Sequence, residues 1–152
     1  MAGLLTIATL LLVLVALSQG TNSESASGCT NSADSKTLTC TNITKLPKHI
    51  DGNVTKLQIR SSKLDSSELE NIDVPKNVGK IEIVDSTLER IENIVLPKHI
   101  MKLRIRNCQI KTIGKFNSAN KHLKELYISQ NRPVKLNIES GAFDNLANLI
   151  HL

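Results

Sequence analysis

Apolar residues recur at fixed places along residues 54–152. Four segments share an eleven-residue pattern with apolar residues at places one, four, six and eleven and a small polar residue or cysteine at place nine, the last place being a proline in the fourth segment. These segments begin at Val54, Val78, Ile100 and Leu123, and a fifth begins at Leu149, so the starts lie 24, 22, 23 and 26 residues apart. Such a period predicts a repeat solenoid, because one unit cannot bury its apolar face alone and must stack on the next.

The apolar residues of successive units are expected to stack as one aliphatic core. The middle of each pattern alternates apolar and polar residues, which predicts a short strand with its apolar side chains turned inward. The predicted ladder is Val54, Leu57, Ile59 and Leu64, then Val78, Ile81, Ile83 and Leu88, then Ile100, Leu103, Ile105 and Ile110, then Leu123, Leu126 and Ile128. The connections, expected to be short turns or single helical turns, carry a second ladder: Leu69, Ile72, Val74, Ile91, Ile94, Leu96, Ile113, Phe116, Ile138, Phe143 and Leu146.

Residues 46–152 resemble the extracellular leucine-rich repeat family of animal secreted and receptor proteins. The closing stretch SGAFDNLANLIHL, residues 140–152, is especially similar to that family's signature. The resemblance implies an α/β-type repeat solenoid, a leucine-rich repeat horseshoe segment with short parallel strands on its concave face and mostly irregular or short-helical convex connections. It also implies that the ninth place bonds the backbone of the turn from within; here that place holds Ser62, Ser86, Cys108 and Asn131.

The N-terminal residues predict export. The stretch 1–20 has an apolar run followed by small residues, which is typical of a secretory signal peptide cleaved after Ser18 or after Gly20. A buried helix or an uncleaved membrane anchor is the alternative, but the run is shorter than a spanning helix needs. We therefore expect a secreted, extracellular protein without stable membrane insertion after cleavage.

The cysteines fit an oxidising compartment. Cys29 and Cys40 lie in the Ser/Thr/Asn-rich segment 21–45, ahead of about four repeats and the start of a fifth in 46–152. A disulfide between them would staple a small cap, whereas two free thiols are the alternative. Cys108, the odd cysteine, occupies a repeat position and is expected to be a buried, unreactive thiol rather than a redox group.

Charge indicates a possible partner. The chain has 19 basic and 14 acidic residues, a formal charge of +5, without the dense basic clustering of a nucleic-acid binder. Outward strand positions are predicted to gather six basic residues and one aromatic residue on the concave face: Lys56, Arg60, Lys80, Lys102, Arg104, Arg106 and Tyr127. This cluster favours a protein or acidic glycan ligand; a merely solvated basic surface is the alternative.

The sequence offers little support for catalysis or for metal or cofactor binding. No sequence motif for catalysis, a metal or a cofactor stands out, so we expect a protein that is not an enzyme and needs no cofactor. His49 and His99 sit in two copies of LPKHI and are expected to be equivalent, exposed turn residues rather than metal ligands. Asn42 and Asn53 begin N-x-Thr sequons; Asn42 is the better predicted glycosylation acceptor, because Asn53 immediately precedes a strand.

The sequence therefore predicts a secreted leucine-rich repeat recognition protein, of the kind found in innate immunity or cell-surface recognition. A structural matrix or adhesion component, and a truncated ectodomain of a Toll-like or other repeat receptor, are the alternatives. Leu149 and Leu152 begin a repeat that does not continue, which predicts either a truncated chain or edge-to-edge self-association through an open strand edge.

Overall fold

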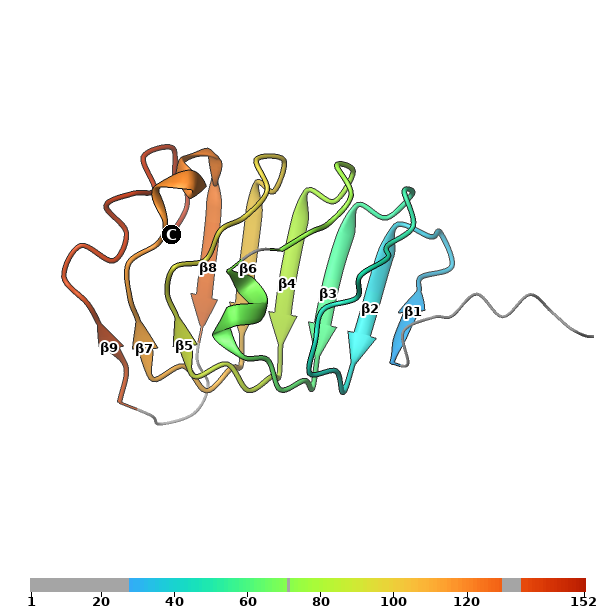
Figure 1. The fold of residues 1–152 in the computed structure, drawn as a ribbon, viewed down its shortest axis with the longest axis horizontal. Helices are drawn as coiled ribbons and strands as arrows, with labels where there is room; N and C mark the ends of the chain where they lie inside the picture. Colours follow the sequence, from blue (N-terminus) through green and yellow to red (C-terminus); the bar gives the residue numbers. More distant parts are fainter. Residues whose placement is uncertain (1–27, 71, 130–134) are drawn as a thin grey trace, which may run out of the picture.

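The computed structural model describes residues 28–70, 72–129 and 135–152, which form a solenoid of stacked coils (Figure 1). Its main sheet has six strands in the order β1-β2-β3-β4-β6-β8. These are β1 (Cys29–Asn31), β2 (Thr37–Thr41), β3 (Lys56–Arg60), β4 (Lys80–Val84), β6 (Lys102–Arg106) and β8 (Glu125–Ser129). All neighbours are parallel except β1 and β2. The predicted signal peptide and Asn131 lie outside the described residues.

The return path of each coil is mostly irregular. It contains a second, three-stranded parallel sheet in the order β5-β7-β9, made of β5 (Arg90–Ile91), β7 (Thr112–Ile113) and β9 (Asn137–Ile138). Two single 3-10 turns, η1 (Ser66–Leu69) and η2 (Ser118–His122), are the helical pieces in the described part of the chain. Neither has the length and apolar character needed to cross a membrane. The prediction of a repeat solenoid with short parallel strands and little helix is confirmed.

The core is the predicted aliphatic ladder. Leu57, Ile81, Leu103 and Leu126 are register partners on successive strands, as are Ile59, Ile83, Ile105 and Ile128. All of these are buried except Ile128, which is partly buried. The second ladder is buried from Leu69 to Phe116, but Ile138 is 51% exposed, because β9 is the last strand of its sheet and nothing described packs beyond it.

A left-handed residue ends each of the first four parallel strands. Asn42, Ser61, Asp85 and Asn107 have φ between 46° and 57°, a region that Asn and Asp adopt more readily than most residues. The chain then turns inward at the ninth place of the repeat. The left-handed turn was not predicted from the sequence, although three of its four residues are Asn or Asp.

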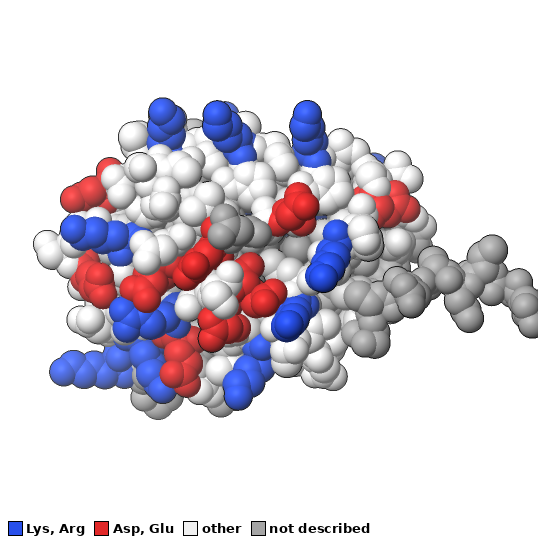
Figure 2. All heavy atoms as spheres, in the orientation of Figure 1, with Lys and Arg blue, Asp and Glu red and all other residues white. Residues whose placement is uncertain are grey.

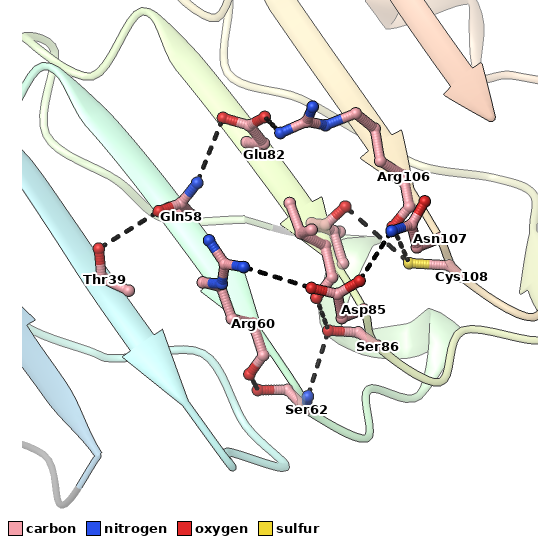
Figure 3. Close-up of polar contacts among 12 residues, drawn as sticks. Thr39, Gln58, Arg60, Ser62, Glu82, Asp85, Ser86, Arg106, Asn107 and Cys108 are labelled. Atoms are coloured by element: carbon pink, nitrogen blue, oxygen red, sulfur yellow. Dashed lines mark hydrogen bonds and ion pairs between the residues drawn. The ribbon is translucent and has the colours of Figure 1, made fainter. Parts of the chain in front are cut away.

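The ninth place bonds the turn from within, as the resemblance implied. The Ser62 hydroxyl donates to the Arg60 carbonyl oxygen (2.7 Å) and accepts from the Ile43 N–H (3.1 Å). Ser86 repeats this one coil later, donating to Val84 and accepting from the Ser62 N–H (3.2 Å). Cys108 continues the ladder, with Sγ 3.4 Å from the Arg106 carbonyl oxygen (Figure 3).

The cap is stapled as predicted. Cys29 and Cys40 are register partners on the antiparallel strands β1 and β2, and their sulfurs form a disulfide. Gly28 precedes the staple with φ 111°, and a Cβ at that position would meet the Thr41 carbonyl oxygen at 2.6 Å. Only glycine fits there without a backbone shift. The hairpin covers the outer edge of β2, which would otherwise expose unpaired backbone groups.

Candidate functional site

The outward residues of the main sheet, which we call the sheet face, form three rows across the strands. The sheet register aligns Thr37, Lys56, Lys80, Lys102 and Glu125 in the first row, Thr39, Gln58, Glu82, Arg104 and Tyr127 in the second, and Thr41, Arg60, Val84, Arg106 and Ser129 in the third. The structure thus brings all seven residues predicted for ligand binding onto one face.

Glu82 lies buried in the middle of this face. Its side chain is only 3% exposed, and three cations surround it. Lys56 Nζ is 2.6 Å from Oε2, Arg106 Nη2 is 2.6 Å from Oε1, and Lys80 Nζ is 3.5 Å from Oε2. Gln58 adds a long hydrogen bond of 3.5 Å from Nε2 (Figure 3). The carboxylate therefore holds cations from β3, β4 and β6 together.

These contacts keep Glu82 ionised. Burial raises its pKa, but the hydrogen bond from Lys56 and the charges of Lys56, Lys80 and Arg106 outweigh burial and lower the pKa to about 2. Burial also lowers the pKa of Lys80, against the attraction of Glu82. Lys56 and Lys80 are only 27% and 24% exposed, so Glu82 draws them toward the sheet and away from solvent.

The strand β6 presents the open part of the sheet face. The side chains of Lys102, Arg104 and Arg106 are 47%, 42% and 45% exposed. Glu125 on β8 pairs with Lys102 at 2.7 Å and lies 3.7 Å from Arg104. Tyr127, the register partner of Arg104, is 49% exposed beside them. Arg104 and Lys102 make no ion pair with the buried Glu82, whereas Arg106 is held by it, so an anion can approach Arg104 and Lys102 past the partly exposed Glu125 alone.

Arg60 lies at the carboxyl-terminal end of β3, at the margin of the sheet face. Its guanidinium lies 3.3 Å from the carboxylate of Asp85, the left-handed residue after β4. Asn107, in the equivalent place one coil later, donates to the other oxygen of Asp85 at 2.9 Å (Figure 3). The sheet face carries six basic residues against Glu82 and Glu125, a balance of +4, and Asp85 at its margin reduces this to +3.

Sequence reasoning missed the burial of Glu82 and Val84. Strand alternation predicted that both point outward, which they do, yet Glu82 and Val84 are only 2% and 5% exposed as whole residues. The long side chains of Lys56, Lys80 and Arg106 gather over Glu82, as Lys and Arg stems commonly cover a strand surface. The one usable signal was Glu82 itself, an acid at an outward place among the basic residues predicted for this face.

In the described part of the chain, no three His, Cys, Asp or Glu side chains are placed to hold a metal ion. Cys108 is buried, and burial raises the pKa of its thiol, so it is a structural thiol as predicted. Two surface hollows, of about 580 and 400 Å³, are lined by residues outside the sheet face.

The histidine prediction needs two corrections. His49 is exposed as predicted, but His99 is partly buried, with its Nε2 atom inaccessible to solvent, and the two residues are not equivalent. The turn into β6 runs from Pro97 to Ile100, so His99 is its third residue, but the turn into β3 runs from Asp51 to Val54. Asn53, rather than His49, is therefore equivalent to His99. The DGNV stretch lengthens the first junction by four residues, which shifts its LPKHI copy out of register.

Both sequon asparagines are exposed. Asn42 follows β2 in the left-handed conformation, and Asn53 lies in the turn before β3. The expectation that Asn53 would be less accessible is wrong, because the turn holds it clear of the strand. Whether either residue is glycosylated stays a prediction.

Comparison with protein-family models, with curated proteins and with solved structures finds no match. The structure shows a solenoid of stacked parallel coils, and the resemblance to leucine-rich repeats stays a prediction from the sequence pattern.

Proposed function

We propose that this chain is a secreted recognition protein of the extracellular leucine-rich repeat type, without catalytic activity, that binds an acidic ligand through its sheet face. In this proposal the face is the concave surface of a horseshoe segment. The observation that carries the proposal is the set of three exposed basic side chains along the strand β6, Lys102, Arg104 and Arg106, with Tyr127 beside them.

Charge complementarity supports an acidic partner. The side chains of Lys102, Arg104 and Arg106 come from one strand and keep close to half of their surface in solvent, although Arg106 also pairs with Glu82. Lys56 and Lys80, the other partners of Glu82, are less exposed. A local excess of positive charge raises the association rate of an anionic ligand and selects against cationic ones. The arginines add bidentate donors for carboxylate or sulfate groups.

The compartment is part of the proposal. The predicted signal peptide, the Cys29–Cys40 disulfide and the two exposed sequons are consistent with the extracellular space, where acidic glycans and protein ectodomains are the available ligands. Recognition at a cell surface, including innate immune recognition, fits this setting.

The test is binding of acidic probes to purified secreted protein. Heparin oligosaccharides and a polyglutamate peptide are titrated against the wild type, the variant K102A/R104A/R106A and a charge-matched control, K45A/K63A/K115A, whose three lysines are exposed and lie outside the strands of the sheet. The proposal expects the first variant to lose about tenfold in affinity for at least one probe and the control to lose little. Equal affinities of both variants for both probes would refute it.

A further inference from the structure

The loops that lead into β4, β6 and β8 each hold one exposed lysine at the same place in a tight turn. The turns run from Pro75 to Val78, from Pro97 to Ile100 and from Asn120 to Leu123, and in each the last N–H lies 2.9 Å from the first carbonyl oxygen. The second residue of the three turns is Lys76, Lys98 and Lys121, and all three are exposed. We call these three residues the lysine row.

The row crosses the coils at right angles to the strands. Backbone hydrogen bonds continue from coil to coil just before the strands, from Met101 N–H to Gly79 (3.0 Å) and from Lys124 N–H to Met101 (3.0 Å). Equivalent residues of neighbouring coils are therefore about one strand spacing, roughly 4.8 Å, apart at the backbone. Figure 2 shows basic side chains standing clear of the surface along this loop edge, at the top of the view.

The row is separate from the sheet face and is not neutralised in the same way. Within residues 28–70, 72–129 and 135–152, the ion pairs involve none of its three lysines, whereas Glu82 holds three cations of the sheet face. The exposed Lys124 adds to the positive charge of the edge, and the exposed Asp73 is the nearest acid in sequence. In the flanking turns, Gly52 and Ala147 occupy the lysine place, so the row spans three coils.

We propose that the lysine row binds a linear sulfated or carboxylated polysaccharide lying across the coils. A chain with anionic groups at regular intervals can meet successive ammonium groups in turn. Lysine suits this role because its ammonium is a compact charge on a flexible stem and can follow an irregular spacing of sulfate groups. This site is distinct from the sheet face, where planar arginines and a tyrosine suit a ligand of defined shape.

The composition of the edge favours a polysaccharide over single-stranded nucleic acid. Proteins that bind such strands stack bases on aromatic side chains. The chain has only one tyrosine and two phenylalanines, and none of them lies in the three turns. Tyr127 is on the sheet face, and Phe116 and Phe143 pack against each other, with ring centroids 6.1 Å apart.

The test titrates short and long fluorescent heparin oligosaccharides against the full secreted chain at low and at physiological salt. The variant K76A/K98A/K121A is compared with K45A/K63A/K115A, which removes the same charge elsewhere, and equal thermal midpoints verify folding. The expected result is a loss of about tenfold for long oligosaccharides in the row variant, with a weaker salt dependence, and little loss for short ones.

Three results would overturn the proposal: equal binding by the row variant and the control, no measurable binding of heparin by the wild type, or tighter binding of homopolymeric RNA that the row variant loses. The variant K102A/R104A/R106A separates this site from the proposed function. If only that variant loses affinity, the sheet face stands and the row does not; if only the row variant loses affinity, the reverse holds.

Discussion

Arg106 reaches diagonally across the sheet to Glu82, with Nη2 2.6 Å from Oε1, although the register pairs Glu82 with Arg104. Lys56 approaches the other carboxylate oxygen at 2.6 Å from the opposite strand. One buried acid therefore links β3, β4 and β6. Arg104 makes no ion pair with Glu82 among the described residues, and its side chain is 42% exposed between Glu82 and Tyr127 in the second row.

Replacing Glu82 with Gln should destabilise the fold by about 1–3 kcal/mol at neutral pH, because Lys56, Lys80 and Arg106 would lose their common counter-charge and repel one another. Urea unfolding followed by circular dichroism measures the change. Glu125→Gln is the matched control: its carboxylate pairs with Lys102 at a more exposed place, so a smaller change is expected there. An E82Q protein as stable as the wild type would contradict the role given to Glu82.

Stability should also fall with acid in a defined window. The pKa of Glu82 is lowered from its ordinary value of 4.5 to about 2, so the unfolded chain takes up a proton before the folded one does. The stabilisation is fully present above about pH 4.5 and is lost as the pH falls toward 2. The difference in unfolding free energy between the wild type and E82Q should therefore shrink over that range. A difference that does not change with pH would show that Glu82 is not held ionised.

Replacing Ser61 should change the stability of the fold in a predictable order. It adopts φ 46° after β3, and the equivalent residues of the other coils are Asn42, Asp85 and Asn107. Asn tolerates the left-handed region better than Ser, so Ser61→Asn should raise stability by about 0.5–1 kcal/mol. Ser61→Val, with a branched Cβ, should instead lower it. The order Asn, Ser, Val in thermal midpoint is the expected result, and any other order would count against the turn.

The repeat pattern predicted the core because strand alternation and a regular period fix which side chains turn inward. Leu57, Ile81 and Leu103 are register partners, as the pattern requires. The covering of Glu82 could not be predicted, since it depends on how long basic side chains from neighbouring strands fold over one position. The exposure of Ile138 could not be predicted because it depends on where the second sheet ends. His49 is not equivalent to His99 because the first junction has four extra residues.

The cap disulfide should contribute measurably. Removing it with Cys29→Ser and Cys40→Ser should lower the unfolding free energy by about 2–4 kcal/mol, mainly through the greater freedom of the unfolded chain. Differential scanning calorimetry with and without reductant gives the comparison. Cys108→Ser is the control. Reductant should lower the stability of this variant by the same amount as that of the wild type, because the Cys108 thiol is unpaired in the described structure.

Secreted material should carry the marks of export. Mass spectrometry is expected to find an N-terminus at Gln19 or Thr21, and a glycan on Asn42, on Asn53 or on both, removable by a peptide amidase and lost on Asn→Gln substitution. A secreted chain that begins at Met1 and carries no glycan would contradict the proposed compartment.

Binding of an acidic ligand by the sheet face is tested most directly by a charge reversal at Arg104, the central basic residue of β6. Arg104→Glu is compared with Lys115→Glu, an equal reversal at an exposed lysine outside the sheet, by measuring the equilibrium affinity for the acidic probe that binds the wild type best. The affinity of R104E for this probe should fall tenfold or more, about 1.4 kcal/mol, while that of K115E stays close to the wild type. An R104E protein that is folded and binds as tightly as K115E would contradict it.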